Sequence, residues 1–558
     1  MDAADHPHPL AALPPGHFLA LPPTFSNDPR TSLTTASHAA PGLAPNVASL
    51  AAADFDVDVR TGFLPPTANV TRLFAPYDVW EDALDAARGA GPGDGLRLGG
   101  CGNGKREQAW REAVAAIGVL PTDQLDDLPH LRRAHLVLAF LLHFYVHSSP
   151  PKSHATPAEV PPSISVPLLA ISPLVGLPPI LTYADTVLWN VHAADKSRPT
   201  NMASNPPATT LGSFTNTKSE AGFYLVSAEC EAAGAAALAL MRQCLDELFL
   251  ADELALRRLT VYLRQLAVQI DRVGDITLRM MTEVDPEEFY HLIRPWFRGG
   301  DGDGPNSPGW IFMGADEHAL SEAENKLAGD NVVGRKFSGP SAGQSSLVHA
   351  FDIFLTVDHA PRPDEETGPV PLATGTATAA VAAKSPAGPE TSTPATVIKL
   401  NATPLRAGTN DEASPASEHP HQQKSGVVEA TFLQRMLQYM PLPHRTFLLH
   451  LSSHPTPLRD LVIKRADTHP ALAAAYDEAL AALRRFRDKH MRVVSRFIVQ
   501  QARRAPSDRI RALLGDAREA EEIVEVEVDG LRGTGGTPLI RFLKRCRDNT
   551  SRAMVTEQ

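Results

Sequence analysis

Apolar residues recur at spacings of three and four along most of this chain, the pattern of helices with one buried face. The pattern is clearest in residues 226–250, 251–281 and 472–503. Shorter stretches of the same kind lie at 78–87, 130–146 and 430–440. In the stretch from about 210 to 340, only the segment at 331–333 hints at a strand. The pattern therefore predicts a mainly α fold.

Two changes of composition divide the predicted helices. Residues 1–48 are rich in Pro, Ala, His and Ser and lack periodicity, so we expect a disordered tail. Residues from about 361 to 425 turn to Pro, Thr, Ala, Gly and Ser, which bury too little apolar surface to offset the chain entropy lost on folding. We expect a small N-terminal domain at 49–205 and a larger helical domain at 206–558, with a disordered insert at about 361–425.

The composition of the chain is that of an ordinary globular protein and disfavours several classes of partner. The 558 residues are 43% hydrophobic and 21% charged, with a net charge of -12. An acidic chain is a poor partner for nucleic acid or an anionic membrane, and the longest apolar run, 136–142, is far shorter than the roughly 20 residues of a membrane span. Four cysteines without a C-x-x-C pair exclude a zinc ribbon and suggest a reducing compartment. We expect a cytoplasmic protein that acts as a monomer.

The stretch at 337–354 contains a candidate nucleophile. Gly339, Ser341 and Gly343 have the G-x-S-x-G spacing of a nucleophile elbow, in which a serine sits on a sharp turn between a strand and a helix. Such a hydrolase needs a parallel sheet, and the residues before Ser341 have the helical pattern instead. Small residues also let a backbone approach a flat ligand closely. We favour this second interpretation, and a serine hydrolase using Ser341 is a distant alternative.

Two further motifs have weak chemical meaning. Residues 99–106 fit G-x-x-x-x-G-K, but Arg106 replaces the Ser or Thr that would hold magnesium, so a loop before a helix is favoured. His143 and His147 lie four residues apart on a predicted helix, a spacing that could chelate a metal. The glutamate that accompanies such a pair in zinc proteases is missing, which favours ordinary core or boundary histidines.

His490 is the strongest candidate for a metal-binding histidine. It falls on one stripe of the predicted helix at 472–503, together with the apolar residues Leu483, Phe486, Val493, Val494 and Phe497. An imidazole in an apolar wall is either a core histidine with an internal hydrogen bond or an axial ligand to haem iron. Its position alone leaves both interpretations open.

Seven segments, taken together and in order, resemble the indoleamine 2,3-dioxygenase family. They are GLPPILTYADTVLWN (176–190), GFYLVSAECE (222–231), DPEEFYHLIRPWFRGG (285–300), GPSAGQSSLVHAFDIFL (339–355), MLQYMPLPHRTFL (436–448), LRRFRDKHMRVVSRFI (483–498) and GTGGTPLIRFLK (533–544). The resemblance implies a two-domain helical protein with non-covalent haem b in the larger domain. It also implies that O2 is added across the indole C2–C3 bond of L-tryptophan to give N-formylkynurenine, the first step of the kynurenine pathway, with an electron donor keeping the iron ferrous.

The resemblance also assigns roles to single positions. His490 corresponds to the proximal ligand of the haem iron, Ser227 to the distal serine beside the bound gas, and Arg294 to the arginine that pairs with the substrate carboxylate. The other positions that match substrate-binding residues are Phe289, Tyr290, Tyr183, Val187, Phe223 and, in the mobile Gly-Thr loop, Thr534. The positions that match cofactor-binding residues are Ser341 and Ala342 at the haem edge, and Arg487 with Asp352 on the propionate side.

Two pocket positions depart from the family pattern. Pro340 stands where many relatives have a second glycine, and Thr186 stands where a cysteine is common. These departures keep an alternative open, in which the chain is a haem-binding paralogue with weak or altered activity that acts as a sensor or on other indoles.

Overall fold

The computed structural model describes residues 55–99, 104–150, 156–196, 198, 200–302, 307–314, 334–359, 431–515 and 539–556. The predicted tail at 1–48, the predicted insert at 361–425, the possible strand at 331–333 and the Gly-Thr loop with Thr534 lie outside these residues.

The described part of the chain is mainly helical, which confirms the predicted fold class. The helices between the N-terminus and the middle of the chain are α3 (Asp78–Arg88), α4 (Lys105–Ala116), α5 (Leu128–His147), α6 (Pro162–Val175), α7 (Lys218–Leu250), α8 (Glu253–Leu278), α9 (Met280–Glu283) and α10 (Pro286–Glu288). Those that follow are α12 (Ser346–Phe354), α13 (Phe432–Leu437), α14 (Leu442–Ser452), α15 (Leu458–Arg465), α16 (Pro470–Val494), α17 (Asp508–Leu514) and α18 (Leu539–Arg552).

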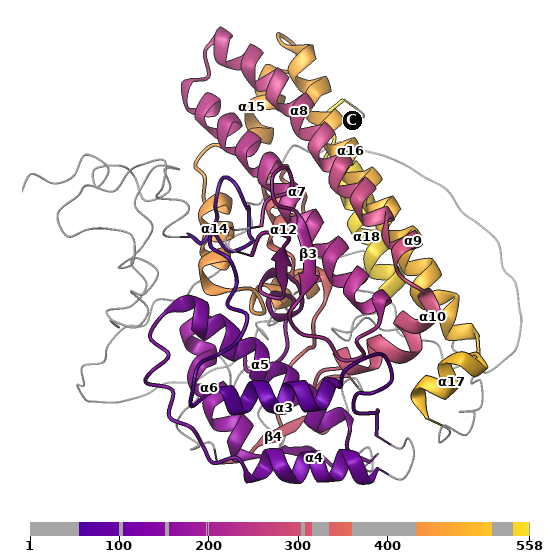
Figure 1. Ribbon diagram of the computed structural model, residues 1–558. Helices are drawn as coiled ribbons and strands as arrows, with labels where there is room; N and C mark the ends of the chain where they lie inside the picture. Colours follow the sequence, from indigo (N-terminus) through magenta and orange to yellow (C-terminus); the bar gives the residue numbers. More distant parts are fainter. Residues whose placement is uncertain are drawn as a thin grey trace, which may run out of the picture.

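The long helices α7, α8 and α16 pack side by side, and α18 lies along α16 (Figure 1). Helices α3, α4, α5 and α6 gather at the opposite end of the molecule, drawn in indigo and purple. Helix α5 belongs to the core, because every residue from Leu131 to Phe144 is buried. Its first turn is capped by Asp127, whose carboxylate accepts a hydrogen bond from the amide of His130.

The described strands form two short pairs. Strand β1 (Ala158–Val160) pairs in parallel with β4 (Trp310–Phe312), and β2 (Val191–Ala193) pairs antiparallel with β3 (Pro207–Thr210). The described residues therefore contain no extended parallel sheet of the kind that an α/β-hydrolase requires.

Helix α7 is long and apolar enough, within the described chain, to cross a bilayer by length and composition alone. However, 61% of its most apolar window is buried inside the protein. Its glutamates are also used internally: Glu247 accepts two hydrogen bonds from Arg258 of α8, and Glu229 pairs with Arg279. These contacts identify α7 as a packed core helix.

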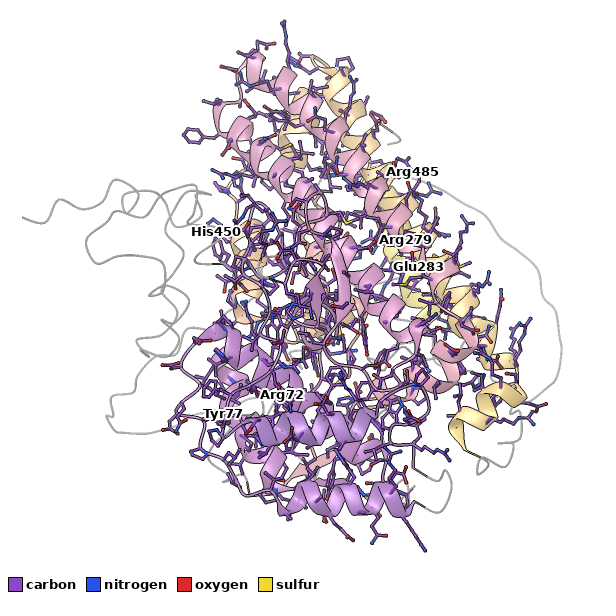
Figure 2. All side chains as sticks on the ribbon, viewed as in Figure 1. Arg72, Tyr77, Arg279, Glu283, His450 and Arg485 are labelled. Atoms are coloured by element: carbon purple, nitrogen blue, oxygen red, sulfur yellow. The ribbon has the colours of Figure 1, made fainter. Side chains whose placement is uncertain are left out.

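Ion pairs lie on the exposed faces of the long helices. Figure 2 shows Arg279 and Glu283 next to one another, and their ion pair measures 2.5 Å. Arg485 projects from α16, where its guanidinium pairs with Asp271 of α8 at 2.5 Å. About half of the Arg485 side chain remains exposed, so such a pair is worth little to stability.

Three π-helical turns interrupt the regular helices. They are Ala184–Leu188 (η2), Phe289–Ile293 (η3) and Ser495–Val499 (η7), and each contributes side chains to the same cavity. Three short 3-10 helices, Arg294–Phe297 (η4), Ala342–Gln344 (η6) and Gln501–Arg503 (η8), complete the described elements. The continuous helix predicted for 472–503 was therefore wrong beyond Val494. Apolar spacing does not distinguish an α turn from a π turn, and π turns concentrate at functional sites.

Candidate active site

One cavity of about 240 Å³ collects most of the predicted site residues. The predicted residues that line it are Tyr183, Val187, Phe223, Ser227, Phe289, Arg294, Ser341, Ala342 and His490. They come from η2 and the residue before it, α7, η3, η4, the start of η6, and α16, so the fold joins positions that are about 300 residues apart in the chain. Most of the remaining wall is apolar, with side chains from α8 and α18.

The α16 wall of the cavity carries the predicted stripe. Phe486, His490, Val493 and Val494 line the cavity, and Phe497 continues the stripe in η7. The ring of His490 is half-buried, and no described residue hydrogen-bonds to it. Burial, and then the nearby charge of Arg487, lowers its pKa to about 4, so the imidazole is neutral near pH 7.

These residues fit haem. The iron needs one neutral imidazole in an apolar wall, and His490 supplies it with a nitrogen lone pair that no described donor occupies. A core histidine usually has an internal hydrogen bond, and neither ring nitrogen of His490 has one within the described chain. The geometry therefore favours the ligand interpretation of His490 over the core interpretation.

Helix α7 presents a row of side chains to the cavity at intervals of one turn. Phe223, Ser227 and Glu231 lie four residues apart, and all three line the cavity. The hydroxyl of Ser227 donates to the carbonyl of Phe223 at 2.8 Å, as serines in helices commonly do. Ser227 thus offers lone pairs and no proton-accepting base. The ring centroid of Phe289 lies 4.8 Å from that of Phe223, which gives this end of the cavity an aromatic wall.

Arg294 is the cation of the cavity wall. Burial lowers its pKa, while the neighbouring Tyr290 opposes the shift. Its guanidinium carbon lies 5.5 Å from the centroid of the Tyr290 ring, a cation–π contact. Tyr290 itself does not line the cavity, so the structure places it beside the arginine. Its contact with the indole stays a prediction.

The loop with Ser341 passes close to the chain at Phe297. A Cβ atom added to Gly339 would lie 1.8 Å from the carbonyl oxygen of Phe297, so this position requires glycine. Ser341 caps η6, and its hydroxyl accepts a 3.3 Å hydrogen bond from the amide of Gly343. No imidazole in the described chain hydrogen-bonds to Ser341, and no extended parallel sheet supports it. The geometry therefore fits a loop against a flat ligand and does not fit a nucleophile elbow.

Arg487 and Asp352 form a buried ion pair behind the α16 wall and do not line the cavity. One guanidinium nitrogen lies 2.5 Å from the Asp352 carboxylate, and His359 approaches the other carboxylate oxygen at 3.0 Å. Burial alone would raise the pKa of Asp352, but the charges of Arg487 and His359 hold it well below its usual range. Arg487 also donates to Thr550 and to the carbonyl of Cys546, 3.1 Å away, on α18. The pair therefore ties α12, α16 and α18 together, and its contact with a propionate stays a prediction.

Glu231 was not predicted as a site residue. The residue lies in the quoted segment 222–231, one helical turn after Ser227, and this spacing is a signal that could have placed it on the cavity wall. The contribution of α18, whose Leu539, Phe542 and Leu543 line the cavity, was not predicted either.

Comparisons with known proteins agree on one family. The family model described as indoleamine 2,3-dioxygenase matches residues 51–553. An indoleamine 2,3-dioxygenase of Saccharomyces cerevisiae is 29% identical, over 79% of this chain and 82% of the relative. Indoleamine 2,3-dioxygenase 1 of Mus musculus is 28% identical, over 80% and 85%, respectively. A 6-hydroxytryptophan 2,3-dioxygenase of Fusarium equiseti is 26% identical, over 89% and 96%.

Proposed function

The chain belongs to the haem-dependent indoleamine 2,3-dioxygenase family and is a dioxygenase of that family, and we propose that its substrate is L-tryptophan. In this proposal both atoms of O2 are added across the indole C2–C3 bond, which breaks, and the product is N-formylkynurenine. One observation carries the proposal: a single apolar cavity holds a neutral imidazole, a guanidinium and an aromatic wall, from His490, Arg294 and Phe289.

The cofactor is haem b, held without a covalent bond. His490 would ligate the iron, and Ser341, Ala342 and Phe542, which line the same cavity, would help to hold the macrocycle. When bound, haem supplies the activation of O2. The electron donor that keeps the iron ferrous, the cytoplasmic location and the monomeric state are parts of the same proposal and rest on the sequence.

The protein orients the substrate. Arg294 presents a planar guanidinium that can make two parallel hydrogen bonds to the amino-acid carboxylate. The rings of Phe223 and Phe289 provide stacking and edge contacts for the indole, and Tyr183 lies in the same wall. The apolar lining excludes water from the reacting atoms.

No strong base is needed at the distal side. The hydroxyl of Ser227 donates its hydrogen to a carbonyl of its own helix. It can accept a hydrogen bond from the indole N–H, but it is not basic enough to take the indole proton. The role of Ser227 is therefore to orient the indole ring.

The substrate range is the open question within the family, since one relative is named for 6-hydroxytryptophan. Thr186 lines the cavity in this chain, but its hydroxyl donates to the carbonyl of Thr182 at 3.1 Å, within its own turn. Like Ser227, Thr186 keeps lone pairs that could accept a hydrogen bond from a ring hydroxyl, so the choice between the two substrates is made by the parallel assay with 6-hydroxytryptophan.

Turnover by the haem-loaded protein tests the proposal. The protein is given a reductant, air and, in parallel, L-tryptophan, 6-hydroxytryptophan and tryptamine, and products are identified by absorbance and mass. We expect N-formylkynurenine, with L-tryptophan preferred. A clear haem spectrum with no product from L-tryptophan would instead support the alternative, a haem-binding paralogue that acts on other indoles or as a sensor. Failure to bind haem would refute both.

A further inference from the structure

Glu231 is a buried carboxyl group in the wall of a mostly apolar cavity. Glu231 is only 2% exposed, and one of its carboxyl oxygens, Oε1, accepts two hydrogen bonds. The hydroxyl of Tyr183 donates at 3.0 Å and the hydroxyl of Ser345 donates at 2.6 Å. The other oxygen, Oε2, is buried with no partner among the described residues. The proposed reaction assigns no role to this carboxyl group.

These two hydrogen bonds connect three elements of the cavity wall. Tyr183 precedes η2, Glu231 lies on α7, and Ser345 caps the first turn of α12. Gln344 adds a second connection, because its amide oxygen accepts from the backbone of Tyr183 at 2.8 Å and its amide nitrogen donates to Gly339 at 2.9 Å. The Tyr183 ring is thus fixed from its hydroxyl end by Glu231 and from its backbone by Gln344.

No cation compensates a charge on Glu231. The titratable groups that face it are Tyr183 from η2 and its own helix neighbour Cys230, while α8 and α12 bring no Lys, Arg or His to it within the described chain. Burial raises the pKa of Tyr183 and raises that of Cys230 to about 12, so both stay protonated and neutral near pH 7. Burial also raises the pKa of Glu231 to about 7, although the hydrogen bonds from Ser345 and Tyr183 oppose the shift.

We propose that Glu231 is a positioning residue for the proposed reaction: as a neutral carboxylic acid it holds Tyr183 in a dry wall against the substrate, and as a carboxylate it admits water into that wall. The neutral acid places its proton on the unpartnered Oε2 and keeps Oε1 for the two hydroxyls. A carboxylate accepts the bonds from Tyr183 and Ser345 more strongly on Oε1, but it leaves a charged Oε2 without a donor in apolar surroundings. Water drawn to Oε2 then occupies space beside Tyr183 that the indole needs, and the affinity for the substrate falls. This inference rests on the proposed function, because it assumes an indole next to Tyr183.

The test uses Glu231→Gln as the matched variant. The amide has the shape of the neutral acid, keeps an oxygen for Tyr183 and Ser345, and does not ionise near pH 7. In the haem-loaded protein we expect the KM and the dissociation constant for L-tryptophan to rise about tenfold for each pH unit above the pKa of about 7. In Glu231→Gln both constants are expected to stay level over that range, since every other titrating group is unchanged.

Two further measurements keep the inference falsifiable. Infrared difference spectra of the haem-loaded protein should show a carbonyl band of a protonated carboxylic acid below pH 7 that is missing in Glu231→Gln. Tyr183→Phe, which removes one of the two hydroxyls, should raise the KM and leave the haem spectrum unchanged. Tyr183→Phe also separates a loss of positioning from a general loss of folding.

The outcomes are distinguishable. A wild-type enzyme whose KM has the same pH profile as that of Glu231→Gln would overturn the inference and leave the proposed function intact. A wild-type enzyme with haem but no turnover at any pH would overturn the proposed function, and the positioning role would fall with it. In that case the infrared band still decides whether Glu231 is neutral below pH 7.

Discussion

The buried ion pair between Arg487 and Asp352 supports a quantitative prediction. Replacing Arg487 with methionine keeps most of the apolar stem but removes the charge that faces Asp352 and the donors that reach Thr550 and the Cys546 carbonyl. Both side chains of the pair are 8% exposed, so solvent does not screen the loss. The change also releases α18, which forms part of the cavity wall.

The expected cost follows from the burial of the pair. Breaking such a pair from one side typically costs about 3–5 kcal/mol, because the remaining charge is left uncompensated. His359 still contacts Asp352 at 3.0 Å. Burial lowers the pKa of His359, but the charge and the hydrogen bond of Asp352 together raise it to about 9, so part of the compensation survives. We therefore expect Arg487→Met to lower the free energy of unfolding by about 3 kcal/mol near pH 7, the lower end of that range.

Urea denaturation at equilibrium measures this cost, with Asp352→Asn and the double variant completing a double-mutant cycle. The sum of the two single-variant costs should exceed the cost of the double variant by about 1 kcal/mol or more, because the two side chains are in contact. Arg485→Met is the matched control on the same helix: its ion pair with Asp271 is exposed, and its loss should cost less than about 1 kcal/mol. Equal costs for Arg487→Met and Arg485→Met, or strict additivity in the cycle, would refute the reasoning.

Three further predictions concern the cavity. Arg294→Ala should raise the KM for L-tryptophan about 10- to 150-fold, the loss of about 1.5–3 kcal/mol of charged hydrogen bonding, with an unchanged haem spectrum; an unchanged KM would refute the substrate pose. Gly339→Ala should lower the melting temperature and the yield of haem-loaded protein, because the added Cβ would lie 1.8 Å from the Phe297 carbonyl oxygen. Gly118→Ala is the control: the added Cβ has nothing within 4 Å, so both quantities should stay unchanged. Between pH 4.5 and about 7 the native state keeps the proton of Glu231, whereas the unfolded state releases it. The free energy of unfolding of the wild type should therefore fall with rising pH, by at most about 3 kcal/mol in total. Urea denaturation of Glu231→Gln over the same range should lack this fall.

The regular helices could be predicted from the sequence, and their irregular parts could not. The apolar spacing of residues 226–250 and 251–281 depends on one buried face, and α7 and α8 have that face. The spacing continues through the π turn at Ser495–Val499 without a visible change. Phe497 in that turn packs against Phe289, and a contact between residues more than 200 positions apart leaves no trace in the local spacing.

The candidate site shows the same division. His490 could be placed in an apolar wall from its own helix, because the neighbours that make the wall lie three and four residues away. Glu231 could not be recognised as a hydrogen-bonded buried acid, since its partners Tyr183 and Ser345 lie 48 and 114 residues away. Tyr290 could not be assigned to the arginine, because the π turn at η3 sets which of the two adjacent aromatic rings faces the cavity.

The most direct test of the central claim is the fate of the two oxygen atoms. Haem-loaded protein is supplied with L-tryptophan and isotopically labelled O2, and the product mass is compared between wild type and His490→Ala. We expect wild-type protein to give N-formylkynurenine carrying both labelled atoms, and His490→Ala to lose the normal haem spectrum and the product together. A product with one label or none, or full activity in His490→Ala, would contradict the claim that this cavity holds haem through His490 and adds dioxygen to an indole.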